Sequence, residues 1–220
     1  MKLREGKMSN SETFIDEVTE EVRKDQLFGY IRKYGWIAVL AVLAIVGGTA
    51  FSELRKAQTE TAAQAAGDTI LAALEIDDDE ARAAALSDIE ATGGAAAITG
   101  LLAAADLTET GDVDGAAAAL EAVALDDGSP QVYRDLATLK SVMVQRDTLS
   151  VQDRRAILSG LAAAGSTFRL VAKEQLALIA VEAGETDDAI TQFVAIAQDA
   201  EVTGGLRDRA FTMIVALGGD

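Results

Sequence analysis

The stretch that decides the fold is LALIAVEAGETDDAITQF, residues 176–193. Its small residues include Ala177, Ala180, Gly184 and Ala189. They lie on both sides of a turn at Gly184, and the large side chain of Phe193 follows Ala189 by four residues. Small residues allow two helices to approach closely, and a larger group fills the space beside them. The stretch therefore predicts a pair of antiparallel helices.

A second copy of this pattern lies 73 residues earlier, where residues 111–116 align with residues 184–189. Its matching positions are Ala103, Ala104, Leu107, Gly111, Ala116 and Leu120. Another turn, at residues 147–153, lies between the two copies, so the implied period is about 36 residues. That period is close to the helical-pair repeat of about 34 residues found in tetratricopeptide proteins, and the pattern of small residues resembles theirs.

Alanine-rich runs alternate with short breaks through the rest of the chain. The breaks lie at residues 92–94, 110–112, 126–130, 147–150, 164–166, 184–185 and 202–205. They contain Gly, Pro, Asp or Ser, which stop one helix or cap the next. The last run, Gly205 to Leu217, has an apolar side that includes Ala210, Phe211 and Ile214 and a charged side, which suits the capping helix that ends a repeat array.

Residues 34–52 form a run of 19 residues without a formal charge. As an α-helix this run would rise roughly 28 Å, about the thickness of the hydrocarbon core of a bilayer. Tyr34 and Trp36 lie at one end, where aromatic rings often settle among lipid headgroups. A buried core helix and a cleaved signal peptide are the alternatives, but 33 residues rich in Asp and Glu precede the run. We predict an uncleaved transmembrane anchor.

The predicted organisation has three parts: an arm at residues 1–33 with an amphipathic helix from Ser11 to Lys33, the transmembrane helix at 34–52, and a repeat domain at 53–220. The fold class is therefore all-α, with one N-terminal transmembrane helix followed by a TPR-like α-solenoid of about four helix pairs and a capping helix. The basic residues near the span are Arg23, Lys24, Arg32 and Lys33 before it, and Arg55 and Lys56 after it. Because basic residues favour the cytoplasmic side, we expect a cytoplasmic arm and, in a bacterium, a periplasmic domain.

Charge and composition exclude several classes of function. The net charge is −17, and residues 53–220 hold 12 Lys/Arg against 29 Asp/Glu. An acidic domain repels nucleic acid, so we expect no nucleic-acid partner. The chain contains no His and no Cys, which removes the commonest general base, the commonest metal ligand and any disulfide.

Acidic side chains offer the remaining candidates for chemistry. Asp77-Asp78-Asp79 lacks the glycine and the later Glu of a calcium loop, so capping of a helix over Glu80–Ala91 is the preferred interpretation. Glu174 with Glu182, or Asp187 with Asp188, are possible carboxylate pairs, but acidic residues on Ala-rich helices usually form a solvated face. We therefore predict no enzyme, no metal, no cofactor and no small-molecule substrate.

The order of these features resembles the YfgM-type ancillary subunit of the SecYEG translocon, a tetratricopeptide repeat-like group, and in particular its alphaproteobacterial members. The phrases that carry the resemblance are Phe14–Asp25, Tyr133–Ala137, Leu161–Arg169, Gly184–Ala189 and Leu206–Ala210. The resemblance implies a single-pass protein of the bacterial inner membrane, with its repeats in the periplasm. Its expected partners are the translocon and periplasmic folding factors, and its expected role is that of a chaperone-like adaptor for exported chains.

The same domain family includes a cell-division coordinator, so that role, or assembly of another membrane complex, is the alternative. In stacked repeats the first helices line a concave face, and we expect a protein-binding groove there. Its candidate residues are Ile98, Leu101, Ala105, Glu174, Leu178 and Val181, for which simple core packing is an equally good interpretation. Ala44 and Gly48 have the small-xxx-small spacing that lets transmembrane helices pack together.

Overall fold

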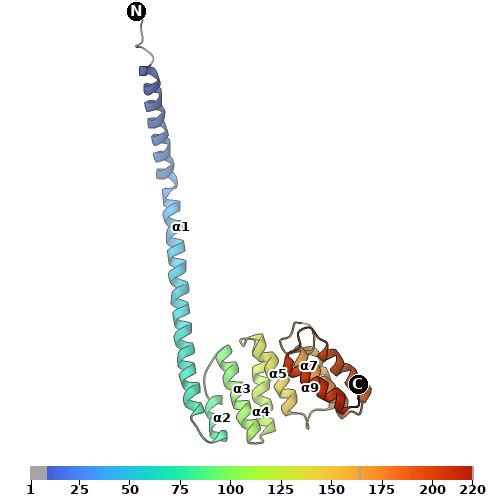
Figure 1. Cartoon of the computed structure of the whole chain (residues 1–220). Coiled ribbons are helices and arrows are strands. Elements are labelled where there is room, and N and C mark those ends of the chain that lie inside the picture. The colour runs from blue at the N-terminus through green and yellow to red at the C-terminus, as the bar shows by residue number, and fades with distance from the viewer. Residues whose placement is uncertain (1–8, 164, 220) are drawn as a thin grey trace, which may run out of the picture. The chain divides into compact units, whose positions relative to one another are not determined.

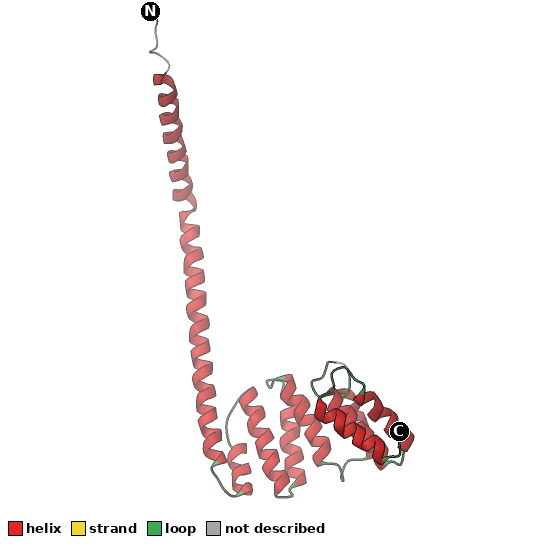
Figure 2. Ribbon diagram, in the orientation of Figure 1, coloured by secondary structure: helices red, strands yellow, loops and turns green. Residues whose placement is uncertain are grey.

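The computed structural model describes the backbone of residues 9–163 and 165–219; within these ranges it describes side chains from residue 32 on, except at residues 34, 35, 38 and 39. Throughout this part of the chain, every regular element is an α-helix (Figure 2). The helices are α1 (Ser9–Leu74), α2 (Asp79–Ser87), α3 (Gly94–Glu109), α4 (Val113–Leu125), α5 (Gln131–Val144), α6 (Val151–Leu161), α7 (Arg169–Glu182), α8 (Thr186–Ala197) and α9 (Gly204–Ala216). The predicted all-α fold class is confirmed.

The chain divides into two units, Met1–Thr61 and Ala62–Asp220. In the first unit, the large apolar side chains that the structure describes are exposed along α1, including Leu40, Leu43 and Ile45. The hydroxyl of Thr49 donates to the carbonyl of Val46 over 2.9 Å, and that of Ser52 donates to the carbonyl of Thr49 over 2.9 Å. The helix backbone thus satisfies both hydroxyl groups.

No helix among the described residues has the length and apolar character needed to cross a membrane. Residues 34, 35, 38 and 39 of the predicted span lie outside the described side chains, so the anchor stays a prediction. The side chains of the predicted amphipathic helix up to Ile31 also lie outside them. The helix begins at Ser9, two residues before the expected start at Ser11.

The second unit consists of consecutive helix pairs (Figure 1). Helix α3 packs against α4, α5 against α6, α7 against α8, and α9 against α8. Helix α2 packs against α3, and Ala73, near the end of α1, belongs to their buried cluster. Buried apolar clusters join each pair to the next. Their members include Leu86 with Ala103, Leu120 with Ala137, Leu139 with Ile179, and Phe193 with Leu206. This architecture is consistent with the predicted TPR-like solenoid of about four pairs and a capping helix.

The small residues of the repeat pattern lie where neighbouring helices touch. In the later copy, Ala177, Ala180, Ala189 and Phe193 are all fully buried. In the earlier copy, Ala103, Ala104, Ala116 and Leu120 are buried as well. Gly111 and Gly184 occupy equivalent turns with φ of 81° and 75°, a left-handed backbone that favours glycine. The structure confirms the two copies that the sequence predicts.

Most of the predicted breaks are loops in the described structure, but Gly94 begins α3, and Gly204 and Gly205 begin α9. The helix that we expected over Glu80–Ala91 is α2. Asp78 caps this helix, because its carboxylate accepts a hydrogen bond from the Ala81 amide over 2.8 Å. Our expectation that the helix reaches Ala91 is wrong. It ends at Ser87, because the Ile89 amide donates to the Leu86 carbonyl, three residues back, and Ile89 packs against the core. Ala164, in another break, lies outside the described residues.

Polar side chains, most of them charged, connect segments that lie about one helix pair apart along the chain. Arg82 of α2 donates to Asp106 of α3 at 2.7 and 3.0 Å. Arg169 of α7 donates to Asp199, in the α8–α9 loop, at 2.8 and 3.0 Å. The Ser129 hydroxyl, before α5, donates to the Gly93 carbonyl over 3.2 Å. Each partner is 24 to 36 residues away along the chain, about one helix pair.

Helix α9 covers the C-terminal end of the array. Leu206, Ala210 and Ile214 are buried against α8 and belong to the last apolar cluster. Phe211, which we expected on the apolar side, is instead 53% exposed. It lies one residue beyond Ala210, about 100° around the helix, and no later helix in the described chain covers that side.

Candidate functional site

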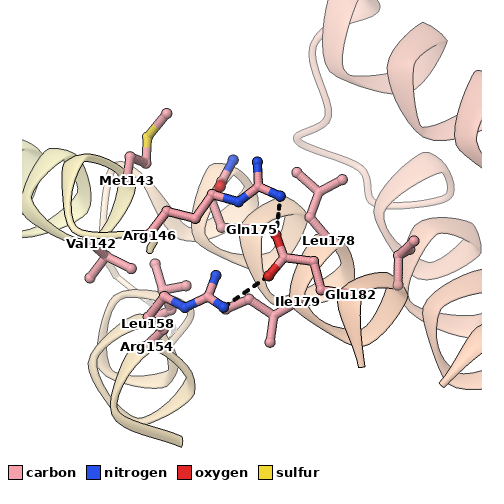
Figure 3. A pocket seen from close by; sticks show the side chains of 10 residues that line it. Val142, Met143, Arg146, Arg154, Leu158, Gln175, Leu178, Ile179 and Glu182 are labelled. Atoms are coloured by element: carbon pink, nitrogen blue, oxygen red, sulfur yellow. Dashed lines mark hydrogen bonds and ion pairs between the residues drawn. The ribbon is translucent and has the colours of Figure 1, made fainter. Parts of the chain in front are cut away.

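A cavity of about 360 Å³ lies between α5, α6 and α7 of the repeat unit (Figure 3). This volume is at the lower end of the roughly 300–1,000 Å³ typical of ligand-binding pockets. The rim includes Met143, which is 50% exposed, and Arg146, whose side chain is 64% exposed. Solvent therefore reaches the cavity from this side.

Most of the cavity wall is apolar. The apolar lining residues are Val142, Met143, Leu158, Leu178, Ile179 and Val181. Gln175 adds one neutral polar side chain. Apolar walls with a few placed polar groups are typical of sites that bind another molecule.

The polar end of the cavity is a carboxylate held between two guanidinium groups. Nη2 of Arg146 lies 2.8 Å from Oε1 of Glu182, and Nη2 of Arg154 lies 2.8 Å from Oε2 (Figure 3). The Arg154 side chain is only 8% exposed and the Glu182 side chain is 28% exposed. Burial of an ion strongly favours pairing with an opposite charge, which accounts for the contact between Arg154 and Glu182.

Helical spacing brings these residues to one place. Arg154 and Leu158 are four residues apart on α6, and Gln175, Leu178 and Glu182 follow at steps of three and four on α7. Residues at these spacings share one face of a helix. Two such faces, together with the C-terminal end of α5, form the walls.

Local sequence also shapes the opening between α5 and α6. Helix α5 ends at Val144, and a loop follows before Ser150 caps α6 through the Asp153 amide at 3.1 Å. This loop carries Arg146 past the end of α5 to the rim of the cavity.

A protein-family model described as the tetratricopeptide repeat-like domain matches residues 29–199. The chain belongs to this family. No curated protein and no solved structure gave a significant match. The TPR-like match includes all three helices that form the cavity, and TPR-like domains are generally non-catalytic protein-interaction modules.

The structure places the predicted groove residues of this TPR-like domain in three environments. Leu178 and Val181 line the cavity. Ile98 and Ala105 are exposed on α3, and Leu101 is half-buried against the α3–α4 core. Glu174 is buried, and its carboxylate is bound by Arg209 of α9. These six residues therefore do not form one continuous site.

The sequence did not predict the roles of Arg146, Arg154 and Glu182. Residues 131–163 keep little of the repeat consensus, so the pattern that located the other pairs gave no guidance there. One signal was present: Arg146, Arg154 and Arg155 bring three basic residues together in an otherwise acidic domain.

The members of the two candidate carboxylate pairs do not face each other across a cleft. Each carboxylate has another role in the fold. Glu174 accepts from Arg209, and Glu182 lies between Arg146 and Arg154. Asp187 and Asp188 lie exposed in the first turn of α8, where acidic residues stabilise a helix. Among the described residues, no group of three or more acidic side chains is placed to hold a metal ion.

Proposed function

We propose that the chain is a membrane-anchored, non-catalytic module that binds other proteins through its repeat domain. The observation that carries this proposal is the cavity between α5, α6 and α7, which has apolar walls and one charged end. Its position within repeats of the TPR-like family supports a protein as the partner.

The anchor in this proposal is the uncharged run at residues 34–52. The hydroxyls of Thr49 and Ser52 bond to carbonyls of their own helix, which lowers the cost of placing them in lipid. The charge distribution supports an arm in the cytoplasm and, in a bacterium, a repeat domain in the periplasm. In that location we propose an ancillary role at the translocon, in which the repeats act as a chaperone-like adaptor for exported proteins together with folding factors.

The alternative is a structural role in assembling another inner-membrane complex, or in coordinating cell division. The small-xxx-small spacing of Ala44 and Gly48 supports this alternative. Apart from the nearby backbone of its own helix and its two chain neighbours, no atom of the described residues lies within 4 Å of where a Cβ on Gly48 would be. A second transmembrane helix could therefore approach closely at this position. Replacing Gly48 with Ile should then displace a membrane partner without affecting binding at the cavity.

Photo-crosslinking in intact membranes tests the proposal directly. A crosslinking amino acid at Met143, on the rim of the cavity, should capture a protein neighbour, which mass spectrometry then identifies. The control position is Leu125, which is 72% exposed and does not line the cavity. Capture of translocon subunits or folding factors at Met143 alone supports the adaptor role, whereas no protein adduct at any exposed position contradicts an interaction module.

Membrane attachment needs a separate test. The full chain should stay in the membrane pellet after alkaline carbonate, and a reporter fused after Asp220 should be active only in the periplasm. A chain released by carbonate would contradict the anchor, and a cytoplasmic reporter would contradict the orientation.

A further inference from the structure

The lining of the cavity is positively charged, although the domain as a whole is acidic. Its charged members are Arg146, Arg154 and Glu182, two cations and one anion. Charges further than about 8–10 Å away are largely screened at physiological salt, so a ligand in the cavity responds mainly to this local excess of positive charge. The local charge therefore favours an acidic ligand.

The charged end of the cavity has more hydrogen-bond donors than acceptors. Arg146 and Arg154 share the single carboxylate of Glu182, which leaves one net positive charge. A guanidinium has five N–H donors, and each of these arginines directs one terminal nitrogen at Glu182. The Nε of Arg154 is buried and has no partner within the described part of the chain.

A purely structural ion pair in the same domain looks different. Glu174 is matched by one arginine, Arg209, whose Nε and Nη2 occupy both carboxylate oxygens at 2.7 and 2.8 Å. That pair is neutral, and both oxygens bond to the same guanidinium. Arg146, by contrast, is a second and largely exposed cation on a carboxylate that Arg154 already neutralises.

We propose that the cavity binds a segment of a partner protein that carries a carboxylate side chain next to a large apolar side chain. The apolar side chain lies against Met143, Leu178 and Val181, the apolar lining residues that solvent reaches, and the carboxylate pairs with Arg146 and Arg154. Glu182 occupies the same guanidinium groups in the free protein, so it competes with the ligand. This inference specifies the chemistry of the partner and rests on the proposed function.

The test measures fluorescence anisotropy of labelled, end-blocked heptapeptides with the full chain in a lipid nanodisc. The peptides pair Glu with Leu, Ile or Phe, and each has a matched peptide with Gln in place of Glu. Hydrogen bonds to charged groups contribute enough that the Gln peptides should bind about tenfold more weakly. Equal affinity of the matched peptides, or no binding of any peptide, would overturn the proposal.

Three variants separate ligand binding from a structural role. Arg146→Gln should weaken binding of the Glu peptides about tenfold, because it removes one charged donor at an exposed position. Glu182→Gln should strengthen binding about tenfold, because it removes the competing carboxylate. Arg155→Gln should change nothing: this neighbouring arginine pairs with Glu185 and does not line the cavity.

The outcome for Glu182→Gln is decisive, since a structural ion pair predicts unchanged or weaker binding when it is broken. Far-UV circular dichroism checks that each variant is folded, and Arg146→Gln remains informative if Glu182→Gln does not fold. Competition of the Glu peptides by vesicles containing an anionic phospholipid would instead assign the cavity to a lipid headgroup and overturn the proposal. If the peptide tests fail while Met143 still crosslinks to a protein, only the chemistry proposed here is wrong and the proposed function stands.

Discussion

Arg209 of α9 donates two parallel hydrogen bonds to the carboxylate of Glu174 of α7, from Nε to Oε1 at 2.7 Å and from Nη2 to Oε2 at 2.8 Å. The two residues are 35 positions apart, so the contact connects the capping helix to the first helix of the preceding pair. The Glu174 carboxylate raises the pKa of Arg209 above its ordinary value. The side chain of Glu174 is 10% exposed, so its buried charge needs Arg209 as a partner.

Replacement of Arg209 by Met should therefore destabilise the domain. The carboxylate of Glu174 would stay buried without its cation, at a cost of about 2 kcal/mol in the free energy of unfolding. Urea unfolding of the full chain in detergent, followed by circular dichroism, measures this change. The control is Arg155→Met, which removes a more exposed pair with Glu185 and should cost less than about 1 kcal/mol. Equal losses in both variants would show that burial of Glu174 has no effect.

The pair formed by Arg169 and Asp199 makes stability depend on acid pH. The Arg169 guanidinium and the Glu201 amide hold the pKa of Asp199 well below its ordinary value of 3.8. A carboxylate whose pKa is lower in the folded state contributes stability that is present above the unfolded pKa and lost as pH falls toward the folded one. The wild type should thus exceed Asp199→Asn in stability at pH 7, and the difference should shrink below about pH 4. A constant difference in melting temperature from pH 7 to 2.5 would contradict the pairing.

Two phenylalanines of the last repeat should respond very differently to truncation. Phe193 is fully buried between α7, α8 and α9, so Phe193→Ala should cost about 3–5 kcal/mol through lost contacts and a cavity. Phe211 is largely exposed, and Phe211→Ala should stay within about 0.5 kcal/mol of the wild type. Denaturant unfolding compares the two, and a large loss on truncating Phe211 would show that another surface covers it.

Two glycine-to-alanine changes should have opposite signs. Gly184 has φ of 75°, so an added Cβ strains the turn between α7 and α8, at a cost of about 1–2 kcal/mol. Gly160 lies in the last turn of α6 with open space around it, so Gly160→Ala should stabilise the helix by up to about 0.5 kcal/mol. Thermal unfolding of both variants tests the pair, and stabilisation by Gly184→Ala would contradict the left-handed turn.

Much of the repeat fold is predictable from sequence because its requirements are local. A close helix approach needs a small residue, and a left-handed turn favours glycine, so Ala116, Ala189, Gly111 and Gly184 are enough to mark two repeats. The end of α2 is less predictable. Glu90 and Ala91 are acceptable in a helix, but packing of Ile89 turns the chain earlier.

The cavity is not predictable from local pattern. Arg146, Arg154 and Glu182 come from a loop and two helices, and 28 residues separate the last two. Only the packed structure brings their charges together. Glu174 illustrates the reverse case, because its helical position suggested a groove whereas the later Arg209 engages it. In both cases, the cavity and the environment of Glu174, a contact between residues far apart in the sequence decides the local structure.

The charged contacts between segments about one helix pair apart have a mechanical consequence. Each connects segments 24 to 35 residues apart, so one such contact can break under tension while the others stay formed. When the repeat domain is stretched in an optical trap, it should unfold in separate steps, beginning with α9. Each later step should release about one helix pair of roughly 34 residues. Such a domain unfolds gradually under force, and its N-terminal helix pairs stay folded after its C-terminal end has unfolded.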